Sequence, residues 1–468
     1  MDIIERLRAE LGEANVLTGS DCAPWAEDWT GKFRGQPLAV VRPASTAEVA
    51  AVMKLASETG TPVVPSSGHT GLVGGTHAPD QLVLSVDRMR KIREIRADAR
   101  LAVVEAGVIL SKLHDAVGEH DLVFPVTFGA RGSAMIGGIL STNAGGSNVL
   151  RYGNTREQVM GIEVVLPSGE VLDLMSELRK DNSGFDLRDL FIGAEGTLGI
   201  VTGAVLKLMP KPKAYATAMV ALPALSDALD LLNRLQAATG GAVEAFEYMP
   251  RLYMERHLAV IDGARPAFDQ IYDVNIMLEV GATAPRDAAV ADDGSVAIVT
   301  ALEEMLGEMI ESGQVLDAVV ARTEAQRAEM WKRREDAAEV SATKRPLVIM
   351  DVAVPLDRVA EFLDRAQIAV DRHDPGAEQF IVAHLGDGNI HLNIWMTEGG
   401  ADNSETILEA VEDVVADMRG SFSAEHGIGL SKQGTMQRRK DRVALEVMTR
   451  IKAALDPDGI MNPGKILP

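Results

Sequence analysis

The chain has 468 residues, of which 46% are hydrophobic and 24% are charged, and a single cysteine, Cys22. A domain typically holds ~100–200 residues, so this length predicts two or three domains. The formal net charge of −22 argues against a nucleic acid partner, because phosphate binding needs clustered Lys and Arg. One cysteine excludes an intramolecular disulfide, a CxxC redox pair and a four-cysteine iron–sulfur cluster within this chain.

The N-terminal residues 1–11 space their apolar side chains as a helix does and interleave them with charges. They lack the uninterrupted apolar core of a signal peptide. Nowhere do 18 apolar residues run together, so no membrane span is expected. These features predict a cytoplasmic protein, and peripheral membrane contact stays open.

Up to about residue 210, short apolar strands are separated by glycine-rich loops. The capping box at 45–48 predicts a helix that runs to about residue 58. Strands are predicted from β-branched content and flanking turn residues at 61–65, 82–86, 101–106, 162–166, 171–174 and 200–208. Prolines in 209–213 stop both helix and central strand, so this segment is interpreted as the linker that ends a first domain, 1–210.

After the linker, strands alternate with longer helices. Strands are predicted at 217–222, 243–248, 271–280, 315–321 and 347–354, and helices at 226–238, 296–312 and 322–340. The pattern is typical of an α+β domain, 211–420, whose antiparallel sheet is covered on one face. The last part, 421–468, is predicted to be a helical segment.

The segment 383–393 carries His384 and His391 around a central Asp-Gly pair. Asp-Gly between apolar runs favours a two-residue hairpin turn, which would place the two histidines directly opposite each other. Cross-strand partners have Cβ atoms roughly 4.5–5.5 Å apart, close enough to share one divalent metal. Downstream, Glu425 and His426 add a carboxylate and a further imidazole, and two His with one carboxylate form a catalytic pattern. The alternative is a structural histidine pair on a half-buried hairpin.

Three glycine-dense blocks lie in the first domain, at 65–75, 129–146 and 193–200. Glycine lets backbone amides approach an anion closely, and successive amides form nests for phosphate oxygens. Neutral donors are added by Ser66, Ser133, Ser141 and Asn143. A diphosphate could therefore bind with little positive charge, although the blocks could also be tight turns. No block has the Rossmann spacing, the lysine-bearing P-loop or the Gly-x-Ser-x-Gly elbow.

In this order, the three blocks resemble the flavin-binding domain of the vanillyl-alcohol oxidase superfamily. Together with the motifs around 384–391 and 425–426, they resemble the FAD-dependent D-2-hydroxyacid dehydrogenases, the branch of glycolate oxidase subunit, D-lactate dehydrogenase and D-2-hydroxyglutarate dehydrogenase. The resemblance covers about 40–468. It implies an α+β fold with a two-subdomain FAD-binding domain, an α+β substrate domain and a helical C-terminal segment that returns to the FAD.

The resemblance also implies which residues bind FAD. They are Pro65, Ser66, Ser67, Gly68, His69, Thr70, Gly71, Gly74 and Gly75 in the first block; Pro125, Gly129, Gly132, Ser133, Ile136, Gly137, Gly138, Ser141, Asn143 and Ala144 around the second; Glu195, Gly196, Gly199 and Ile200 in the third; and Asn462. Some relatives bond the flavin covalently to a histidine of the first loop. This branch usually binds FAD non-covalently, so non-covalent binding is expected and attachment through His69 is the alternative.

The resemblance further places one divalent metal on His384, His391 and Glu425, with His426 as the base. Zinc is the expected metal, and manganese and iron are alternatives because ligand preferences overlap. A cation bound to the substrate hydroxyl and one carboxylate oxygen would lower the hydroxyl pKa and orient the substrate. His426 would accept the proton, and a hydride would pass to flavin N5.

Arg334 matches a family arginine that clamps the substrate carboxylate, a task that suits a planar bidentate group. Its alternative is a solvated helix face. Asn393 lies two residues beyond His391, hence on the same strand face, and resembles a family substrate contact.

Substrate choice is expected to depend on two departures from the family. Hydroxyglutarate-specific members carry a threonine and a lysine for the distal carboxylate, where this chain has Ala338 and Ile349. A second carboxylate would be unpaired against apolar groups, which is costly. A monocarboxylic substrate is therefore expected, such as D-lactate or a larger apolar 2-hydroxyacid. D-2-hydroxyglutarate is the alternative, because Lys344 or Arg345 could compensate.

Two other functions compete with this interpretation: a zinc hydrolase built on the two His and one Glu, and a flavin-dependent sugar oxidase. The chain has no haem motif and no iron–sulfur set, so reduced flavin must pass electrons to a separate acceptor. That acceptor would be a quinone, an electron-transfer flavoprotein or a cytochrome. A homodimer is an open alternative to a monomer.

Overall fold

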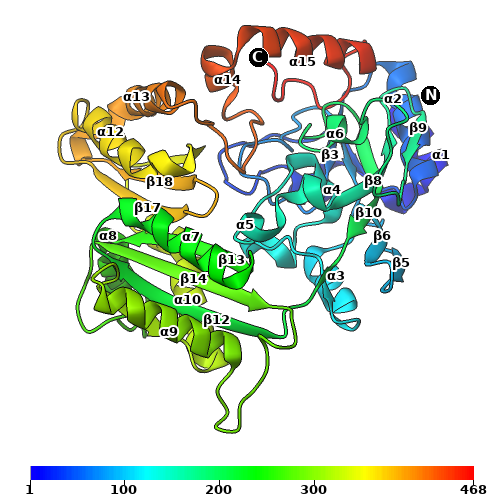
Figure 1. The fold of residues 1–468 in the computed structure, drawn as a ribbon. Coiled ribbons are helices and arrows are strands. Elements are labelled where there is room, and N and C mark those ends of the chain that lie inside the picture. The colour runs from blue at the N-terminus through cyan, green and yellow to red at the C-terminus, as the bar shows by residue number, and fades with distance from the viewer. Residues whose placement is uncertain (1) are drawn as a thin grey trace. The chain divides into compact units, whose positions relative to one another are not determined.

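The computed structural model describes residues 2–468 (Figure 1). Its internal contacts divide the chain into two units. The first unit contains the residues up to Gly146, then 153–210 and 425–468. The second unit contains 147–152 and 211–424. Among the described residues, no helix is both long and apolar enough to cross a bilayer.

One sheet of the first unit is built on parallel strands. Its order is β1 (Val16–Leu17), β2 (Ala39–Val41), β4 (Leu82–Ser85), β3 (Val63–Ser66), with β2, β4 and β3 parallel and β1 antiparallel. Helices α1 (Ile3–Leu11) and α2 (Thr46–Thr59) share its apolar core. The predicted helix start at Ser45 is confirmed, since Ser45 Oγ accepts the amide of Glu48. The reciprocal bond of the capping box is shifted by one residue, because the Glu48 carboxylate accepts the amide of Ala44 instead of that of Ser45.

The second sheet of the first unit is antiparallel. Its order is β5 (Ile92–Arg96), β6 (Leu101–Glu105), β10 (Ile200–Lys207), β8 (Val159–Val165), β9 (Val171–Leu174). The core beneath it is completed by α3 (Leu110–Gly118), α4 (Ile136–Thr142), α6 (Arg188–Phe191) and one side of α15 (Arg442–Leu455). Helix α14 (Gln433–Arg439) precedes α15.

The predicted linker begins inside the first unit. Met209–Pro210 forms β11, a short strand that pairs with β7 (Leu122–Val123). A proline is tolerated there because this two-stranded ladder consists of edge strands. The linker interpretation is therefore corrected for these two residues, and the division between the units follows directly after Pro210.

The second unit contains one seven-stranded antiparallel sheet. Its order is β15 (Asp317–Val320), β12 (Ala214–Leu222), β14 (Val274–Ala282), β13 (Val243–Pro250), β17 (Glu378–His384), β18 (Asn389–Trp395), β16 (Leu347–Ala353). The short helix α5 (Val149–Tyr152) also belongs to this unit. The antiparallel sheet predicted for the α+β domain is confirmed.

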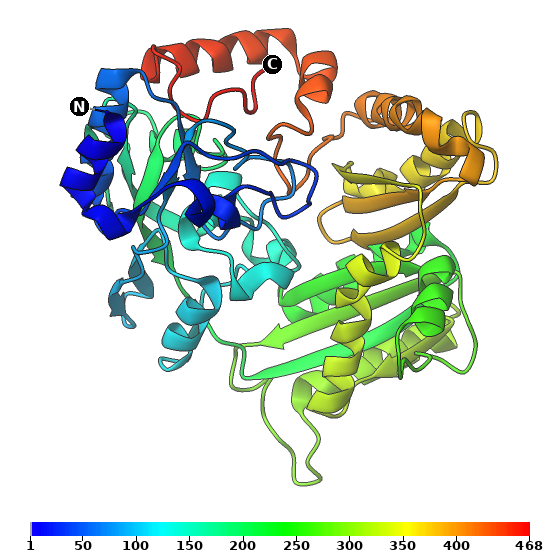
Figure 2. The same cartoon turned by 180° about the vertical axis from the view of Figure 1, so that it is seen from behind.

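Helices cover both faces of this sheet, which corrects the expectation of a single covered face. Helices α7 (Ala228–Thr239), α9 (Ala297–Glu311), α12 (Val359–Asp371) and α13 (Ser404–Asp417) share the larger core with one face. Helices α8 (Arg251–Val260), α10 (Glu324–Glu335) and α11 (Ala337–Ser341) share a smaller core with the other, and Figure 2 shows α10 crossing it. The strands are buried on both sides, so their hydrophobic pattern does not distinguish the faces.

The hairpin between β17 and β18 has a different register from the predicted one. His384 pairs with Asn389, and His391 pairs with Val382, so the two histidines are diagonal neighbours instead of direct partners. The shift is by two residues, which keeps both side chains on one face. The loop of the hairpin therefore spans residues 385–388, and it closes where the amides of Asp387 and Gly388 donate to His384 O at 3.3 and 3.1 Å.

Candidate active site

The three glycine blocks lie against one another in the first unit. A Cβ at Gly68 would stand 2.4 Å from Ser133 O, and one at Gly196 would stand 2.4 Å from the ring of Pro65. The amide of Glu195 donates to Ser141 O at 2.7 Å, which joins the second block to the third. These approaches require glycine because any side chain would collide with backbone or proline.

Asn462 joins the C-terminal segment to two of the blocks. Its side-chain nitrogen donates to Glu195 O at 2.8 Å and to Gly75 O at 3.3 Å. Nearby backbone strengthens the connection, since Met461 forms a parallel bridge with Val63 at the edge of the first sheet. Residues that are nearly 400 positions apart thereby form one loop cluster, and all residues assigned to FAD by resemblance belong to this unit.

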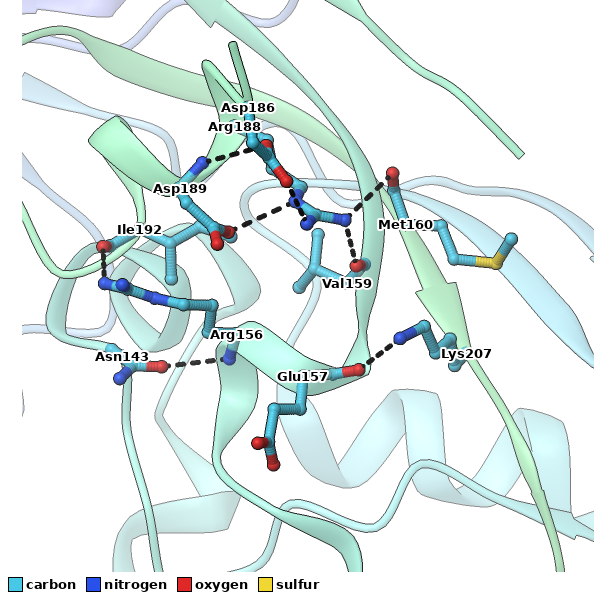
Figure 3. A network of polar contacts seen from close by, with 10 residues as sticks. All are labelled: Asn143, Arg156, Glu157, Val159, Met160, Asp186, Arg188, Asp189, Ile192 and Lys207. Atoms are coloured by element: carbon cyan, nitrogen blue, oxygen red, sulfur yellow. Dashed lines mark hydrogen bonds and ion pairs between the residues drawn. The ribbon is translucent and has the colours of Figure 1, made fainter. Parts of the chain in front are cut away.

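The second block contains Asn143, whose left-handed backbone (φ 49°) terminates α4. Asn143 Oδ1 accepts the amide of Arg156 at 2.9 Å, and the Arg156 guanidinium donates to Ile192 O at 2.6 Å (Figure 3). In the same network Arg188 donates to Val159 O at 2.8 Å (Figure 3). Arg156 thus joins the Asn143 turn to the segment before the third block, and Arg188 joins that segment to β8.

Glu195 has a contact that the resemblance did not indicate. Its side chain is buried, and its two oxygens accept the amides of Ile428 and Gly429 at 2.7 and 2.8 Å. Burial raises the pKa of Glu195, and these two hydrogen bonds offset the rise only in part. A Cβ at Gly427 would collide with the same carboxylate. The side chain therefore positions the loop that directly follows Glu425 and His426.

Glu425 and His426 both lie in the first unit, at the start of that loop, with ligand atoms within 4.8 Å of each other. The Glu425 carboxylate accepts the amide of Gly146 at 2.7 Å. Glu425, which was predicted to bind a metal, is thus hydrogen-bonded to Gly146 at the end of the second glycine block.

In the second unit, one face of the sheet gathers polar side chains. Strand alternation and register place the following residues on the face covered by α10: Glu247, Glu279, Ile349, Asp351, His384, Asn389, His391 and Asn393. An aromatic cluster lies beside them, with Phe380 stacked on Trp395 at a centroid distance of 4.5 Å. The sequence predicted three of these polar residues as site residues, and the register brings them together.

His384 and Arg334 meet at one buried carboxylate. Glu247, which is fully buried, accepts His384 Nδ1 at 2.9 Å with one oxygen and Arg334 Nε at 2.7 Å with the other. Arg334 Nη2 also lies 3.4 Å from His384 Nε2. Arginine can only donate, so Nε2 is the accepting nitrogen and Nδ1 carries the proton. Burial alone would raise the pKa of Glu247, but its interactions with His384 and Arg334 bring it below its usual value.

His391 has a similar environment. Its ring lies 5.2 Å from that of His384, centroid to centroid, at an interplanar angle of 79°. Asp351, its cross-strand partner, is buried and has a carboxylate oxygen 3.8 Å from His391 Nδ1. Asn389 donates to the same Asp351 oxygen at 2.9 Å. The two imidazoles thus meet edge to face, each with a buried carboxylate at its Nδ1.

Glu247 and Asp351 were missed in the sequence. Both are acidic residues within largely apolar strands, a pattern that indicates a buried polar group but does not identify its partner. Their partners are 137 positions away for Glu247 and 40 positions away for Asp351, so only the sheet register reveals the pairs.

The residues proposed to set substrate choice lie near the edge of this face. Ile349 pairs with Asn393 and is 55% exposed. Ala338 is exposed on α11. Lys344 forms an ion pair with Glu378 and lies over the ring of Trp395.

Comparison with known proteins agrees with this architecture. Residues 211–466 match the family described as FAD linked oxidases, C-terminal domain, and residues 37–175 match the FAD binding domain. A D-2-hydroxyglutarate dehydrogenase of Xanthomonas citri pv. viticola is 36% identical over 453 residues, covering 96% of this chain and 93% of that protein. The mitochondrial D-2-hydroxyglutarate dehydrogenase of Bos taurus is 35% identical, covering 94% and 79%.

Solved structures show the same fold at low sequence identity. p-Cresol methylhydroxylase with bound substrate superposes with a TM-score of 0.73 at 16% identity, covering 99% of this chain and 96% of that chain. The 4-ethylphenol oxidase from Gulosibacter chungangensis gives a TM-score of 0.72 at 20% identity, covering 100% and 97%. The expected vanillyl-alcohol oxidase type of fold is thereby confirmed. The chain belongs to the FAD-linked oxidases, in the branch of the FAD-dependent D-2-hydroxyacid dehydrogenases.

Proposed function

We propose that this protein oxidises a D-2-hydroxyacid to the 2-oxoacid, using non-covalent FAD in the first unit and a divalent metal held by His384, His391 and Glu425. The observation that carries the proposal is in the second unit. There a histidine in the tautomer that a metal requires lies beside a partly buried arginine suited to a carboxylate. A zinc hydrolase would leave the FAD-binding domain without a role.

The first unit suits an FAD diphosphate. Ser66 Oγ and Ser67 Oγ are buried and have no hydrogen-bond partner among residues 2–468, an arrangement that costs free energy unless a ligand supplies one. A Cβ at Gly71, Gly129 or Gly132 would meet no protein atom within 4 Å, so internal packing does not require glycine there. Backbone amides at such positions are open to phosphate oxygens.

His69 supports non-covalent binding. Its Nε2 lies 2.8 Å from Glu27 O, and a carbonyl oxygen only accepts, so Nε2 carries the proton. Thr76 Oγ1 then donates to the other ring nitrogen at 3.3 Å. Both nitrogens are engaged with the protein, which disfavours a bond from either one to the flavin.

The metal ligands fit a divalent cation of the zinc, manganese or iron type, with zinc the expected ion. His384 offers Nε2, because its Nδ1–H is held by Glu247. Ala424 donates its amide to Asp351 O at 3.2 Å, directly opposite His391 in the sheet. We propose Glu425, the residue that follows Ala424, as the third ligand.

Each residue of the proposed site has a separate role in the reaction. Arg334 binds the substrate carboxylate, with Nε committed to Glu247 and the terminal nitrogens directed to the ligand. Asn393, on the same strand face as His391, orients the substrate by hydrogen bonding. His426 accepts the hydroxyl proton at its ring nitrogen. When bound, FAD supplies the hydride acceptor and the metal supplies a Lewis acid for the hydroxyl. Electrons leave to a separate acceptor.

For the substrate we propose a monocarboxylic 2-hydroxyacid with an apolar side chain, such as D-lactate or a longer homologue. Lys344 is already paired with Glu378, and Ile349 presents an apolar surface beside Asn393. The relatives named D-2-hydroxyglutarate dehydrogenase favour D-2-hydroxyglutarate as the second candidate.

Anaerobic mixing with D- and L-2-hydroxyacids tests the proposal, with loss of the flavin absorbance as the signal. D-2-Hydroxyacids should bleach the flavin and L-enantiomers should not. Chelation, or His426→Ala, should slow bleaching by ~10²–10⁴-fold, the usual range for a lost general base. His120→Ala, at an exposed histidine, is the matched control and should react as the parent does. Undiminished flavin reduction after chelation and in His426→Ala would contradict the mechanism.

A further inference from the structure

Glu247 lies at the centre of the second unit's polar face and contacts two residues of the proposed site at once. Its two oxygens are divided between them: one accepts His384 Nδ1 at 2.9 Å, and the other accepts Arg334 Nε at 2.7 Å. The carboxylate is fully buried, and burying a charge is costly unless each oxygen is paired. Glu247 is therefore held as a charged group by these two partners.

The contacts define the orientation of both partners. The bond to Glu247 keeps the proton of His384 on Nδ1 and directs Nε2 away from Glu247. This is the tautomer that a metal ligand needs, because Nε2 then carries the lone pair. The bond to Nε uses the side edge of the Arg334 guanidinium and leaves the terminal nitrogens as the anion-binding edge. One carboxylate on β13 thus aligns a ligand from β17 with an arginine from α10.

We propose that Glu247 is a positioning residue that sets the metal affinity of His384 and the substrate-carboxylate affinity of Arg334 together. This inference rests on the proposed function. The carboxylate does not act on the substrate; it fixes the tautomer of one residue and the rotamer of the other. Loss of its charge should therefore weaken two kinds of binding that a merely structural ion pair would leave intact.

The test compares three variants of the full-length FAD-bound enzyme. Glu247→Gln removes the charge at constant size, and Glu247→Asp keeps the charge on a shorter arm. Glu244→Gln is the matched control, because Glu244 is buried on the same strand but is paired with Arg151 at 2.8 Å and Tyr152 at 2.6 Å instead of with the proposed site residues. Zinc affinity is measured by competition with a chelator, and 2-oxoacid affinity by its perturbation of the flavin spectrum.

Glu247→Gln should lower zinc affinity ~10–100-fold, the usual effect of losing a carboxylate that orients a ligand histidine. It should also raise the dissociation constant of the 2-oxoacid, while Glu247→Asp recovers part of both and Glu244→Gln changes neither. Unchanged zinc and 2-oxoacid affinities in Glu247→Gln would overturn the proposal while leaving the proposed function standing. Equal losses in Glu244→Gln would also overturn it, since the effect would then be general damage to β13.

A second readout separates this inference from the proposed function. In the metal-stripped enzyme, imidazole ¹⁵N spectra should show His384 protonated at Nδ1, with the signal assigned by its loss in His384→Asn. In Glu247→Gln that preference should weaken. If the parent enzyme binds no zinc, the proposed function fails, and the tautomer signal still decides the role of Glu247. An unchanged tautomer in Glu247→Gln would refute that role.

Discussion

Two buried glutamates show how the neighbouring groups set the pKa of a carboxyl in this protein. Glu195 and Glu247 are both buried glutamates. Glu195 accepts two backbone amides, and burial keeps its pKa above the usual value. Glu247 faces a guanidinium and an imidazole, and its pKa is held below the usual value despite complete burial. The group with charged partners is the one suited to orient a metal ligand, while the other holds a loop.

Lys465 provides a pH-dependent prediction at the same scale. Burial lowers its pKa to about 8, and its ammonium donates to His77 O at 2.9 Å. Between pH 8 and the unfolded value of about 10.4, the unfolded chain binds a proton that the folded chain lacks. Stability must then rise with pH across this window, by up to about 3 kcal/mol. Urea unfolding of the parent should show this rise.

Lys465→Met should lack that rise, whereas Lys54→Met, at an exposed lysine, should keep it. The comparison is the difference in unfolding free energy between parent and variant at pH 8 and pH 10.5. Parallel pH profiles for the parent and Lys465→Met would refute the burial argument.

At the scale of elements, the β17–β18 hairpin decides the histidine geometry. Its turn contains Gly388 at φ +81°, and a Cβ there would stand 2.3 Å from Val354 O. Gly388→Ala should therefore combine left-handed backbone strain with a backbone collision. Gly263 has a similar φ of +75° and nothing within 4 Å of a Cβ, so Gly263→Ala isolates the strain.

We expect Gly263→Ala to cost ~1 kcal/mol of unfolding free energy, as left-handed strain usually does. Gly388→Ala should cost more than about 2 kcal/mol and reduce the zinc retained, because the collision displaces the turn beside His384. Unfolding curves and zinc content measure both effects. Equal unfolding free energies of the two variants would show that the backbone at Val354 moves away from the added Cβ without loss of stability.

For the whole molecule, the two proposed ligands should be separable because their residues belong mainly to different units. Chelation should abolish flavin reduction by substrate while the flavin absorbance stays with the protein. FAD removal should lower the unfolding free energy, since a ligand at 100 times its dissociation constant adds about 2.7 kcal/mol. Refilling with FAD, and separately with zinc, should restore each property independently. Release of FAD on chelation alone would contradict separate sites.

Sequence and structure contributed different parts of this picture. Glycine blocks, β-branched runs and the capping box at Ser45 depend on local chemistry, so they predicted the elements and the FAD-binding domain. The motifs around His384 and Glu425 indicated a redox site by resemblance. Local patterns did not reveal the register of the hairpin, because the Asp-Gly pair lies in a four-residue loop that closes on His384 O instead of forming a two-residue turn.

The amino-acid sequence by itself determined the family, the cofactor class and the identity of the candidate ligands, since these depend on residue types at short spacing. The tertiary structure alone decided that Glu247 and Asp351 stand behind the two histidines and that Glu195 holds the loop after His426. Such partners come from strands and loops distant in the chain. Their pairing is set by sheet register and burial, which carry no local signature in the sequence.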